Sequence, residues 1–146
     1  MGKATLLPTD VVLDSKSFSI RAIAESIQKN EILIPICYHW PQKEESRFIE
    51  SMLLRIPLGP IYFEEMDDGR YGVIDGAKRM NAVLHMICQQ RQFCSLEYYS
   101  CYNDKYFRQL EKYHQRRILE TQLMVHAIAK NVPQAVKDNL VMRFQT

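Results

Sequence analysis

Residues 74–82 read Ile74-Asp75-Gly76-Ala77-Lys78-Arg79-Met80-Asn81-Ala82, and this stretch decides how the fold is interpreted. The apolar run before Asp75 is typical of a strand, and Gly76 follows at once. A helix is then predicted from Ala77, because the apolar residues after it recur with helical spacing. Those residues are Met80, Val83, Leu84 and Ile87. The stretch is therefore expected to be a junction of a strand, a glycine and a helix.

The start of this helix is a candidate binding site for an anion. The first turn of a helix has free backbone N–H groups and a partial positive charge. Gly76 lacks a Cβ, which lets a ligand approach the backbone, and Lys78 and Arg79 add two cations in the same turn. Arginine can hold a phosphate through two parallel hydrogen bonds, whereas lysine acts as a point charge. We therefore predict a phosphate, sulfate or nucleotide at this turn.

Asp75 adds a hydrogen-bond acceptor to the same site. Its carboxylate can hold a ribose hydroxyl, bind a hydrated metal ion or orient an attacking water. In the alternative interpretation Asp75 only caps the helix, while Lys78 and Arg79 point into solvent. The local pattern leaves both interpretations open.

The chain before the junction predicts two helices, a short strand and a hairpin. Asp68-Gly69 lies between two strand-like runs, and this dipeptide is a strong hairpin signal. Pro35 stops the short strand, since proline has no backbone N–H to donate. The expected elements are a helix from Ile20 to Asn30, a strand at 32–34, a helix from Lys43 to Arg55, and hairpin strands at 61–63 and 70–74.

The chain after the junction predicts a second group of elements. Leu123, Val125 and Ala127 alternate with more polar residues, which is typical of a strand from Gln122 to Ile128. Pro133 is suited to be the first residue of a last helix. The other expectations are a weak strand near 93–99, a polar helical stretch near 105–119, and a buried face of the last helix formed by Val136, Leu140 and Phe144. The fold class is therefore α+β, with a small mixed sheet and flanking helices.

Length and composition fit one soluble domain. The chain has 146 residues, of which 47% are hydrophobic and 25% charged, with a formal net charge of +2. No apolar run approaches the roughly 20 residues that a membrane span needs, and no secretory signal is visible, so we expect a cytoplasmic protein without membrane contact. We divide the chain into an N-terminal arm, residues 1–16, and one domain, residues 17–146.

The cysteines and histidines do not form a recognisable metal site. No pair has C-x-x-C spacing, and no histidine falls at zinc-finger spacing, so no metal ligand is predicted from them. We expect four reduced, mostly buried thiols, at Cys37, Cys88, Cys94 and Cys101. His85 and His126 are expected to have structural roles, because they fall within a predicted helix and a predicted strand.

A set of ordered motifs resembles the N-terminal domain of GmrSD-type restriction enzymes. That family has I-P, a Trp, a helix, I-P-hydrophobic-x-P-I, a hairpin and D-G-Q-Q-R in this order. The matching residues here are Ile34-Pro35, Trp40, 46–53, 56–62 and 73–79, followed by 123–128, 131–133, 136–137 and 142–146. The resemblance covers roughly residues 17 to 146.

The resemblance implies a ParB/sulfiredoxin-like fold, in which a G-x-x-R-x-x-A helix start binds nucleotide phosphates. Gly76, Arg79 and Ala82 fit that spacing. It also implies a nucleoside triphosphate, with Mg²⁺ as its companion, whose hydrolysis licenses a separate nuclease domain or subunit that cleaves DNA. On this basis Asp75 and Arg79 are the candidate catalytic residues. The candidate nucleotide-binding residues are Gly76, Ala77, Lys78, Arg79 and His39, the last because it lies in the loop where the family keeps a functional Q-R.

Two departures from the family pattern leave two functions open. The family's D-G-Q-Q-R is D-G-A-K-R here, and the Q-R after I-P is missing from the segment Ile36 to Trp40. The first hypothesis is a nucleoside-triphosphate-binding and hydrolysing domain of a restriction or phage-defence protein. The second is a catalytically degenerate module that binds nucleotide or DNA and acts through a partner. Sulfiredoxin activity is excluded, since Ala77 stands where that activity needs a cysteine.

The stretch from Lys105 to Arg117 combines basic residues with aromatic ones. Such a pattern can bind nucleic acid. It can equally be a solvated helix whose aromatic residues face the core. We expect at most weak, salt-sensitive binding of nucleic acid by this stretch.

Overall fold

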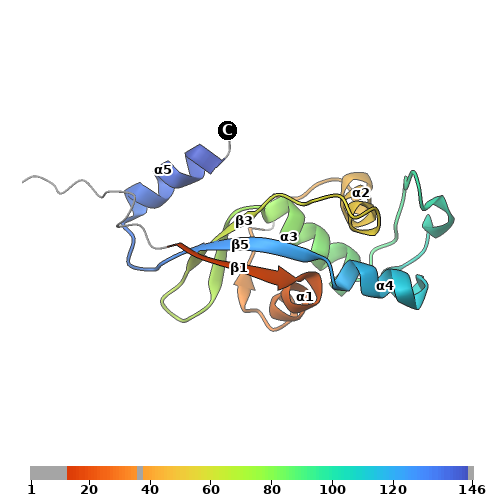
Figure 1. Ribbon diagram of the computed structural model, residues 1–146, viewed down its shortest axis with the longest axis horizontal. Helices are drawn as coiled ribbons and strands as arrows, with labels where there is room; N and C mark the ends of the chain where they lie inside the picture. Colours follow the sequence, from red (N-terminus) through yellow and green to blue (C-terminus); the bar gives the residue numbers. More distant parts are fainter. Residues whose placement is uncertain (1–12, 36–37, 145–146) are drawn as a thin grey trace, which may run out of the picture.

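The computed structural model describes residues 13–35 and 38–144, and its central feature is one five-stranded sheet (Figure 1). The strands are β1 (Leu13–Ser19), β2 (Ile32–Leu33), β3 (Ile61–Glu65), β4 (Tyr71–Asp75) and β5 (Gln122–Ile128). Their order in the sheet is β1-β5-β3-β4-β2. The β1–β5 and β3–β4 pairs are antiparallel, whereas β3–β5 and β2–β4 are parallel. The sheet is therefore mixed, as predicted.

Helices flank this sheet and close a single core. They are α1 (Ile20–Gln28), α2 (Gln42–Leu53), α3 (Ala77–Val83), α4 (Lys112–Leu119) and α5 (Gln134–Phe144). The inward residues Leu123 and Val125 of β5 belong to the same buried cluster as Ile20 of α1 and Met80 of α3. Figure 1 shows α4 and α5 at opposite ends of β5. The α+β class with a small mixed sheet is confirmed, and it is compatible with the ParB/sulfiredoxin-like fold that the resemblance implies.

Capping and turn residues mark the ends of several predicted elements. The Ser19 side chain caps α1 by accepting a hydrogen bond of 3.1 Å from the backbone N–H of Ala22. Asn30 follows α1 with a φ of 60°, a conformation that asparagine tolerates better than most residues. Gly69 has a φ of 88° at the tip of the β3–β4 hairpin. These observations confirm the first helix and the hairpin.

Strand β1 was not predicted, and it shows that part of the expected N-terminal arm belongs to the sheet. Leu13 pairs with Ile128 and Ser19 pairs with Gln122 in one antiparallel ladder. Five of the seven residues of β1 are exposed, so the strand lacks a clear apolar alternation and only its partner reveals it. Residues 13–16, assigned from the sequence to an arm, are thus part of the sheet. Residues 1–12 lie outside the described residues, and for them the arm stays a prediction.

The predicted strand near 93–99 is wrong. This segment is part of a loop between α3 and α4 that holds only short turns, although Phe93 and Leu96 are buried. The expected helical stretch from 105 to 119 is also shorter than predicted. It divides into a 3₁₀ turn at Phe107–Gln109 and the helix α4.

Buried polar side chains of α2 hold this loop in place. Glu50 is 4% exposed, and its carboxylate accepts hydrogen bonds from the backbone N–H groups of Glu97, Tyr98 and Tyr99 at 3.2, 2.8 and 2.9 Å. Ser46 is fully buried, and its hydroxyl accepts one bond of 3.1 Å from the N–H of Cys94. The loop therefore has polar anchors in place of ladder bonds.

The C-terminal helix and the cysteines differ in part from expectation. In α5, Val136 and Leu140 are only half-buried, while Lys137 is buried and lies 3.3 Å from Glu64. The side chain of Phe144 lies outside the described residues.

Cys88 and Cys94 are half-buried and Cys101 is exposed, and all three are free thiols. Cys37 lies outside the described residues.

Within residues 13–35 and 38–144, every helix is too short or too polar to cross a lipid bilayer.

Glu50→Ala should lower the free energy of unfolding by about 2–4 kcal/mol, because three backbone N–H groups lose a charged, buried acceptor. Glu50→Gln keeps one acceptor oxygen and should fall between this variant and the wild type. Lys43→Ala is the control, since Lys43 is an exposed residue of the same helix. Denaturant unfolding followed by circular dichroism measures all three. Equal stability of Glu50→Ala and Lys43→Ala would show that the loop does not depend on Glu50.

Candidate functional site

The junction between β4 and α3 requires a glycine for two reasons. Gly76 has φ 110° and ψ 17°, a left-handed conformation that other residues adopt only with strain. A Cβ on Gly76 would also lie 3.0 Å from both Cγ1 and Cγ2 of Ile61. The space that the missing Cβ leaves is thus filled by Ile61 of β3 rather than being open to a ligand.

A pocket of about 460 Å³ lies beside this junction. Its volume falls within the usual range of small-molecule sites, roughly 300–1,000 Å³. Its lining residues come from the segment before α2 and from the junction itself, and they are Pro35, Tyr38, Trp40 and 74–79. The room that an anion would need at this turn is therefore present.

The first turn of α3 presents backbone donors at the pocket. The N–H of Met80 donates to the carbonyl of Gly76 at 3.0 Å, so the N–H groups of residues 77–79 precede the first intrahelical bond. Gly76 supplies no side-chain cap for them. These three N–H groups carry the partial positive charge at the N-terminal end of α3, where the helix meets the pocket.

Arg79 is already bound to the protein by part of its guanidinium. One terminal nitrogen donates to the carbonyl of Gly59, and the other donates to the carbonyl of Pro60 at 3.0 Å. Burial lowers the pKa of the Arg79 guanidinium from its ordinary value, and the charge of Asp75 opposes that shift. An arginine carries five N–H groups, so two bonds leave three for another acceptor. Arg79 therefore holds the loop between α2 and β3 and keeps donors for a ligand.

Asp75 and Lys78 have no such commitment. Neither side chain makes a hydrogen bond or an ion pair with residues 13–35 or 38–144, although both line the pocket. Asp75 is half-buried at the end of β4, and Lys78 is exposed. A carboxylate that interacts electrostatically with Arg79, and an ammonium group without a partner among the described residues, thus line the same pocket.

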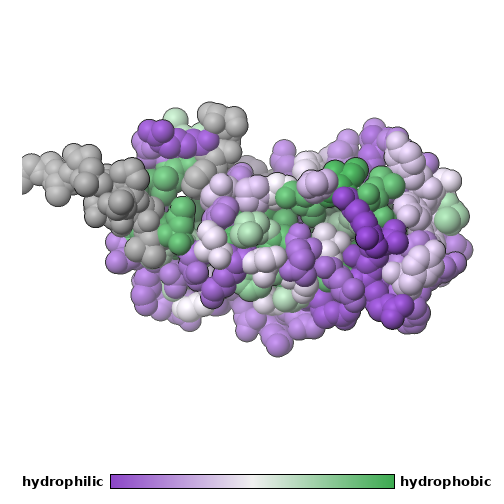
Figure 2. All heavy atoms as spheres, viewed as in Figure 1, coloured by the Kyte–Doolittle hydropathy of each residue, from purple (hydrophilic) through white to green (hydrophobic). Residues whose placement is uncertain are grey.

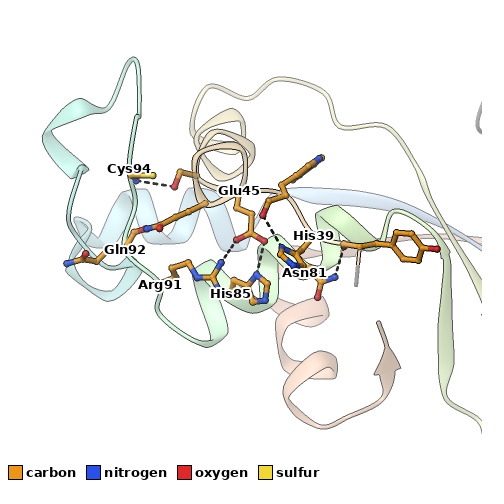
Figure 3. Close-up of polar contacts among 11 residues, drawn as sticks. His39, Glu45, Asn81, His85, Arg91, Gln92 and Cys94 are labelled. Atoms are coloured by element: carbon orange, nitrogen blue, oxygen red, sulfur yellow. Dashed lines mark hydrogen bonds and ion pairs between the residues drawn. The ribbon is translucent and has the colours of Figure 1, made fainter. Parts of the chain in front are cut away.

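His39 does not line the pocket. Its Nδ1 lies 3.3 Å from the carbonyl oxygen of Trp40, and its ring packs edge-on against His85 with centroids 6.0 Å apart. Figure 3 shows His39 beside His85 and Asn81 of the third helix. The contact between His39 and a nucleotide stays a prediction that this geometry does not favour.

Asn81 is a site residue that the sequence did not single out. It is fully buried, and its side-chain amide donates to the carbonyls of Pro35 and Tyr38 at 3.0 and 2.8 Å. These bonds fix the loop that carries Tyr38 against α3 (Figure 3). An asparagine within an apolar helical face was the available signal.

A buried carboxylate supports the same wall of the site. Glu45 of α2 is fully buried, and its two oxygens contact Nδ1 of His85 at 2.7 Å and Arg91 at 3.1 Å (Figure 3). His85 lies in a π-helical turn, Leu84–Cys88, that continues α3. The cluster ties α2 to the third helix and confirms the structural role expected for His85. His126 likewise has a structural contact, since its Nδ1 lies 2.6 Å from the hydroxyl of Ser15 in β1.

A comparison with family models gives one match. The model of the N-terminal domain of the GmrSD restriction endonuclease matches residues 22–143. The chain belongs to this family. A search of curated proteins and a search of solved structures each found no match.

Membership of the GmrSD N-terminal family supports a role in restriction. The family name is that of an endonuclease, so the assignment suggests DNA and a nuclease domain or partner. Residues 22–143 include every element that lines the pocket. The pocket thus lies within the part of this chain that matches the family model.

Gly76→Ala should destabilise the domain more than Gly69→Ala. Both glycines have positive φ, but nothing lies within 4 Å of a Cβ at position 69, whereas Ile61 is 3.0 Å from one at position 76. We expect a loss of about 1 kcal/mol for Gly69→Ala, from backbone strain alone, and of about 2–4 kcal/mol for Gly76→Ala, where overpacking adds to strain. Thermal unfolding of both variants measures the difference. Equal losses would mean that Ile61 moves aside without cost.

Proposed function

We propose that this GmrSD domain binds a nucleoside triphosphate in the pocket at the start of α3, and that the bound nucleotide controls an associated nuclease. The observation that carries the proposal is one pocket of about 460 Å³ with cations and free helix donors beside two aromatic side chains.

The α3 end of the pocket suits the phosphates. The N–H groups of residues 77–79 lack intrahelical acceptors, and such a turn binds anions well. Lys78 is exposed and unpaired among the described residues, so it can approach a phosphate without breaking another contact. Arg79 adds its remaining N–H groups, which form stronger bonds to charged oxygens than to neutral ones.

The aromatic wall of the pocket, formed by Tyr38 and Trp40, suits the base. Tyr38 is 58% exposed, and Trp40 lines the same pocket. Trp40 also packs against Phe48 of α2, with ring centroids 5.6 Å apart, which keeps its indole in place. Aromatic faces stack with any base, so this wall supports nucleotide binding without selecting a particular base.

Asp75 is the residue best suited to hydrolysis. Its carboxylate attracts the Arg79 guanidinium but forms no hydrogen bond or ion pair within the described part of the chain, so it can accept a bond from a water or a ribose hydroxyl. No group of three or more His, Cys, Asp or Glu side chains among the described residues could hold a metal ion. Mg²⁺ often binds through one carboxylate and the substrate's phosphates, so Asp75 fits Mg²⁺ only together with a nucleotide. There the ion would neutralise charge on the phosphates.

A second candidate function is nucleotide binding without hydrolysis. Ala77 and Lys78 stand where the family resemblance expects two glutamine amides, and neither replacement can position a water in the same way. In this case the domain senses a nucleotide and acts only through its nuclease partner.

Arg79→Ala should weaken nucleotide binding by about tenfold or more, and Lys78→Ala should weaken it less. Arg79 offers a planar donor and also fixes the loop at Gly59 and Pro60, whereas Lys78 contributes charge alone. Calorimetric titration of a nucleoside triphosphate into each variant, after circular dichroism has shown that both fold, makes the comparison. A larger loss for Lys78→Ala would mean that the phosphates lie elsewhere in the pocket.

Asp75→Asn separates the two candidate functions. If the domain hydrolyses the nucleotide, this variant should retain binding within about threefold but lose roughly a hundredfold or more of the phosphate release seen with Mg²⁺. Wild-type protein that binds the nucleotide but releases no phosphate would support the sensing module instead. Wild-type protein that does not bind nucleoside triphosphates would contradict both.

A further inference from the structure

A second pocket, of about 590 Å³, lies between α4 and the loop after α2. It is distinct from the pocket at Gly76, since the two share no lining residue. Its residues come from the end of α2, the loop that follows, and the segment from α4 to β5, and they are Met52, 55–58, Tyr113, Arg116, Arg117 and 120–122. We propose that this pocket, which we call the arginine pocket, binds one unstacked nucleotide unit of a single-stranded nucleic acid and its flanking phosphates.

The charge of the arginine pocket favours a polyanion. Arg55, Arg116 and Arg117 face a single carboxylate, that of Glu120, which leaves a net of two positive side-chain charges. Arg117 donates to the carbonyl of Leu53 at 3.1 Å, so one arginine is anchored to the end of α2. Arg55 and Arg116 are exposed and have no side-chain hydrogen bond or ion pair with the described residues. The guanidinium groups of these two arginines are therefore available to bind phosphates.

The backbone conformation of Arg55 supports a role for its side chain in binding at the arginine pocket. Arg55 has a φ of 59°, and it donates its N–H to Met52 while Ile56 donates to Ser51. These two bonds form the Schellman motif that ends many helices, in which this position is usually glycine. An arginine is strained here, whereas glycine would not be. The strain is retained at a residue whose charged side chain lines the pocket.

The floor of the pocket suits a base rather than a phosphate alone. Tyr113 and Ile56 are 49% and 50% exposed, and Pro57 and Leu58 extend the same apolar surface. Figure 2 shows hydrophobic side chains over the loop after α2, directly beside strongly hydrophilic ones toward α4. A base in a duplex is stacked and paired, so it cannot enter such a hollow, whereas an unpaired base can lie against Tyr113.

This arrangement refines the two interpretations of the basic stretch from Lys105 to Arg117. Phe107 is buried, as expected for a solvated helix whose aromatic residues face the core, whereas Tyr106 is half-buried and lies beneath Arg108, with 5.0 Å between the guanidinium and the ring centroid. Tyr113 and Arg116 instead join residues of a distant loop. The proposal does not depend on nucleotide binding at Gly76, because it uses other residues.

The test is fluorescence anisotropy of a labelled 12-nucleotide thymidine strand with the full chain, without nucleoside triphosphate and over a range of salt concentrations. Arg55→Gly combined with Arg116→Gln should weaken binding by about tenfold or more and lower the slope of log K against log salt by about 1–1.5, since roughly 0.7 is lost per phosphate contact on a single strand. Tyr113→Ala should weaken binding by about fivefold or more, through lost stacking.

Lys112→Gln is the matched control, because Lys112 is an exposed cation of α4 that does not line the pocket. It should change the affinity by less than about threefold. Arg55→Gly alone should unfold at the same temperature as the wild type or above it, so any lost binding cannot be attributed to unfolding.

Three results would overturn the proposal. The first is a double variant that binds like the Lys112→Gln protein. The second is wild-type protein that binds a duplex of the same length as tightly as the single strand. The third is displacement of the strand by polyglutamate at equal charge concentration, which would assign the pocket to an acidic protein partner.

Discussion

The contact between Gly76 and Ile61 sets the geometry of the site. Gly76 must turn the chain in a left-handed conformation while its Cα face rests on a side chain of the neighbouring strand. That contact fixes where α3 begins over the sheet. One turn later Arg79 reaches the loop at Gly59 and Pro60, and Asn81 reaches the loop at Pro35 and Tyr38. A helix of only seven residues thus orients two loops, one of which lines the pocket at Gly76 while the other lines the arginine pocket.

The loop between α2 and β3 connects the two pockets physically. Its last residues, Gly59 and Pro60, are held by Arg79, and its first residues, Arg55 to Leu58, line the arginine pocket. The loop is thus a covalent connection between the two pockets, held by Arg79 at one end and carrying Arg55 at the other.

The sequence predicted those elements whose signals are local. The hairpin at Asp68-Gly69, the helix from Ile20 and the strand from Gln122 carry their own turn residues or periodicity, and each was found. Strand β1 was missed because its residues are mostly exposed, so pairing with β5 defines it and not its own pattern. The segment near 93–99 was taken for a strand because it is apolar in places. The backbone N–H groups of Cys94 and of residues 97–99 in fact donate to Ser46 and Glu50, two residues that look like solvent-facing positions of a helix.

In the site, too, the features set by neighbouring residues were predicted, and those set by tertiary packing were not. The strand–glycine–helix junction and the presence of Asp75 and Lys78 in one pocket followed from adjacent residues. The bonds of Arg79 to a loop twenty residues earlier could not be read from spacing, because they depend on how β3 lies beside β4. The positions of His39 and Asn81 depend on the packing of α2 against the third helix, which no local pattern encodes.

The place of β5 in the sheet also governs the order in which the domain can form during synthesis. Strand β5 lies between β1 and β3, so β1 has no partner in the described sheet until residues 122–128 have left the ribosome. Until then β1 is unpaired and β3 has an unpaired edge, and such edges favour aggregation. Because the residues of β1 are mostly polar and exposed, the unpaired strand is less prone to aggregate than an apolar one would be. A nascent chain that stalls before β5 would therefore leave an open sheet, whatever the state of the pocket at Gly76.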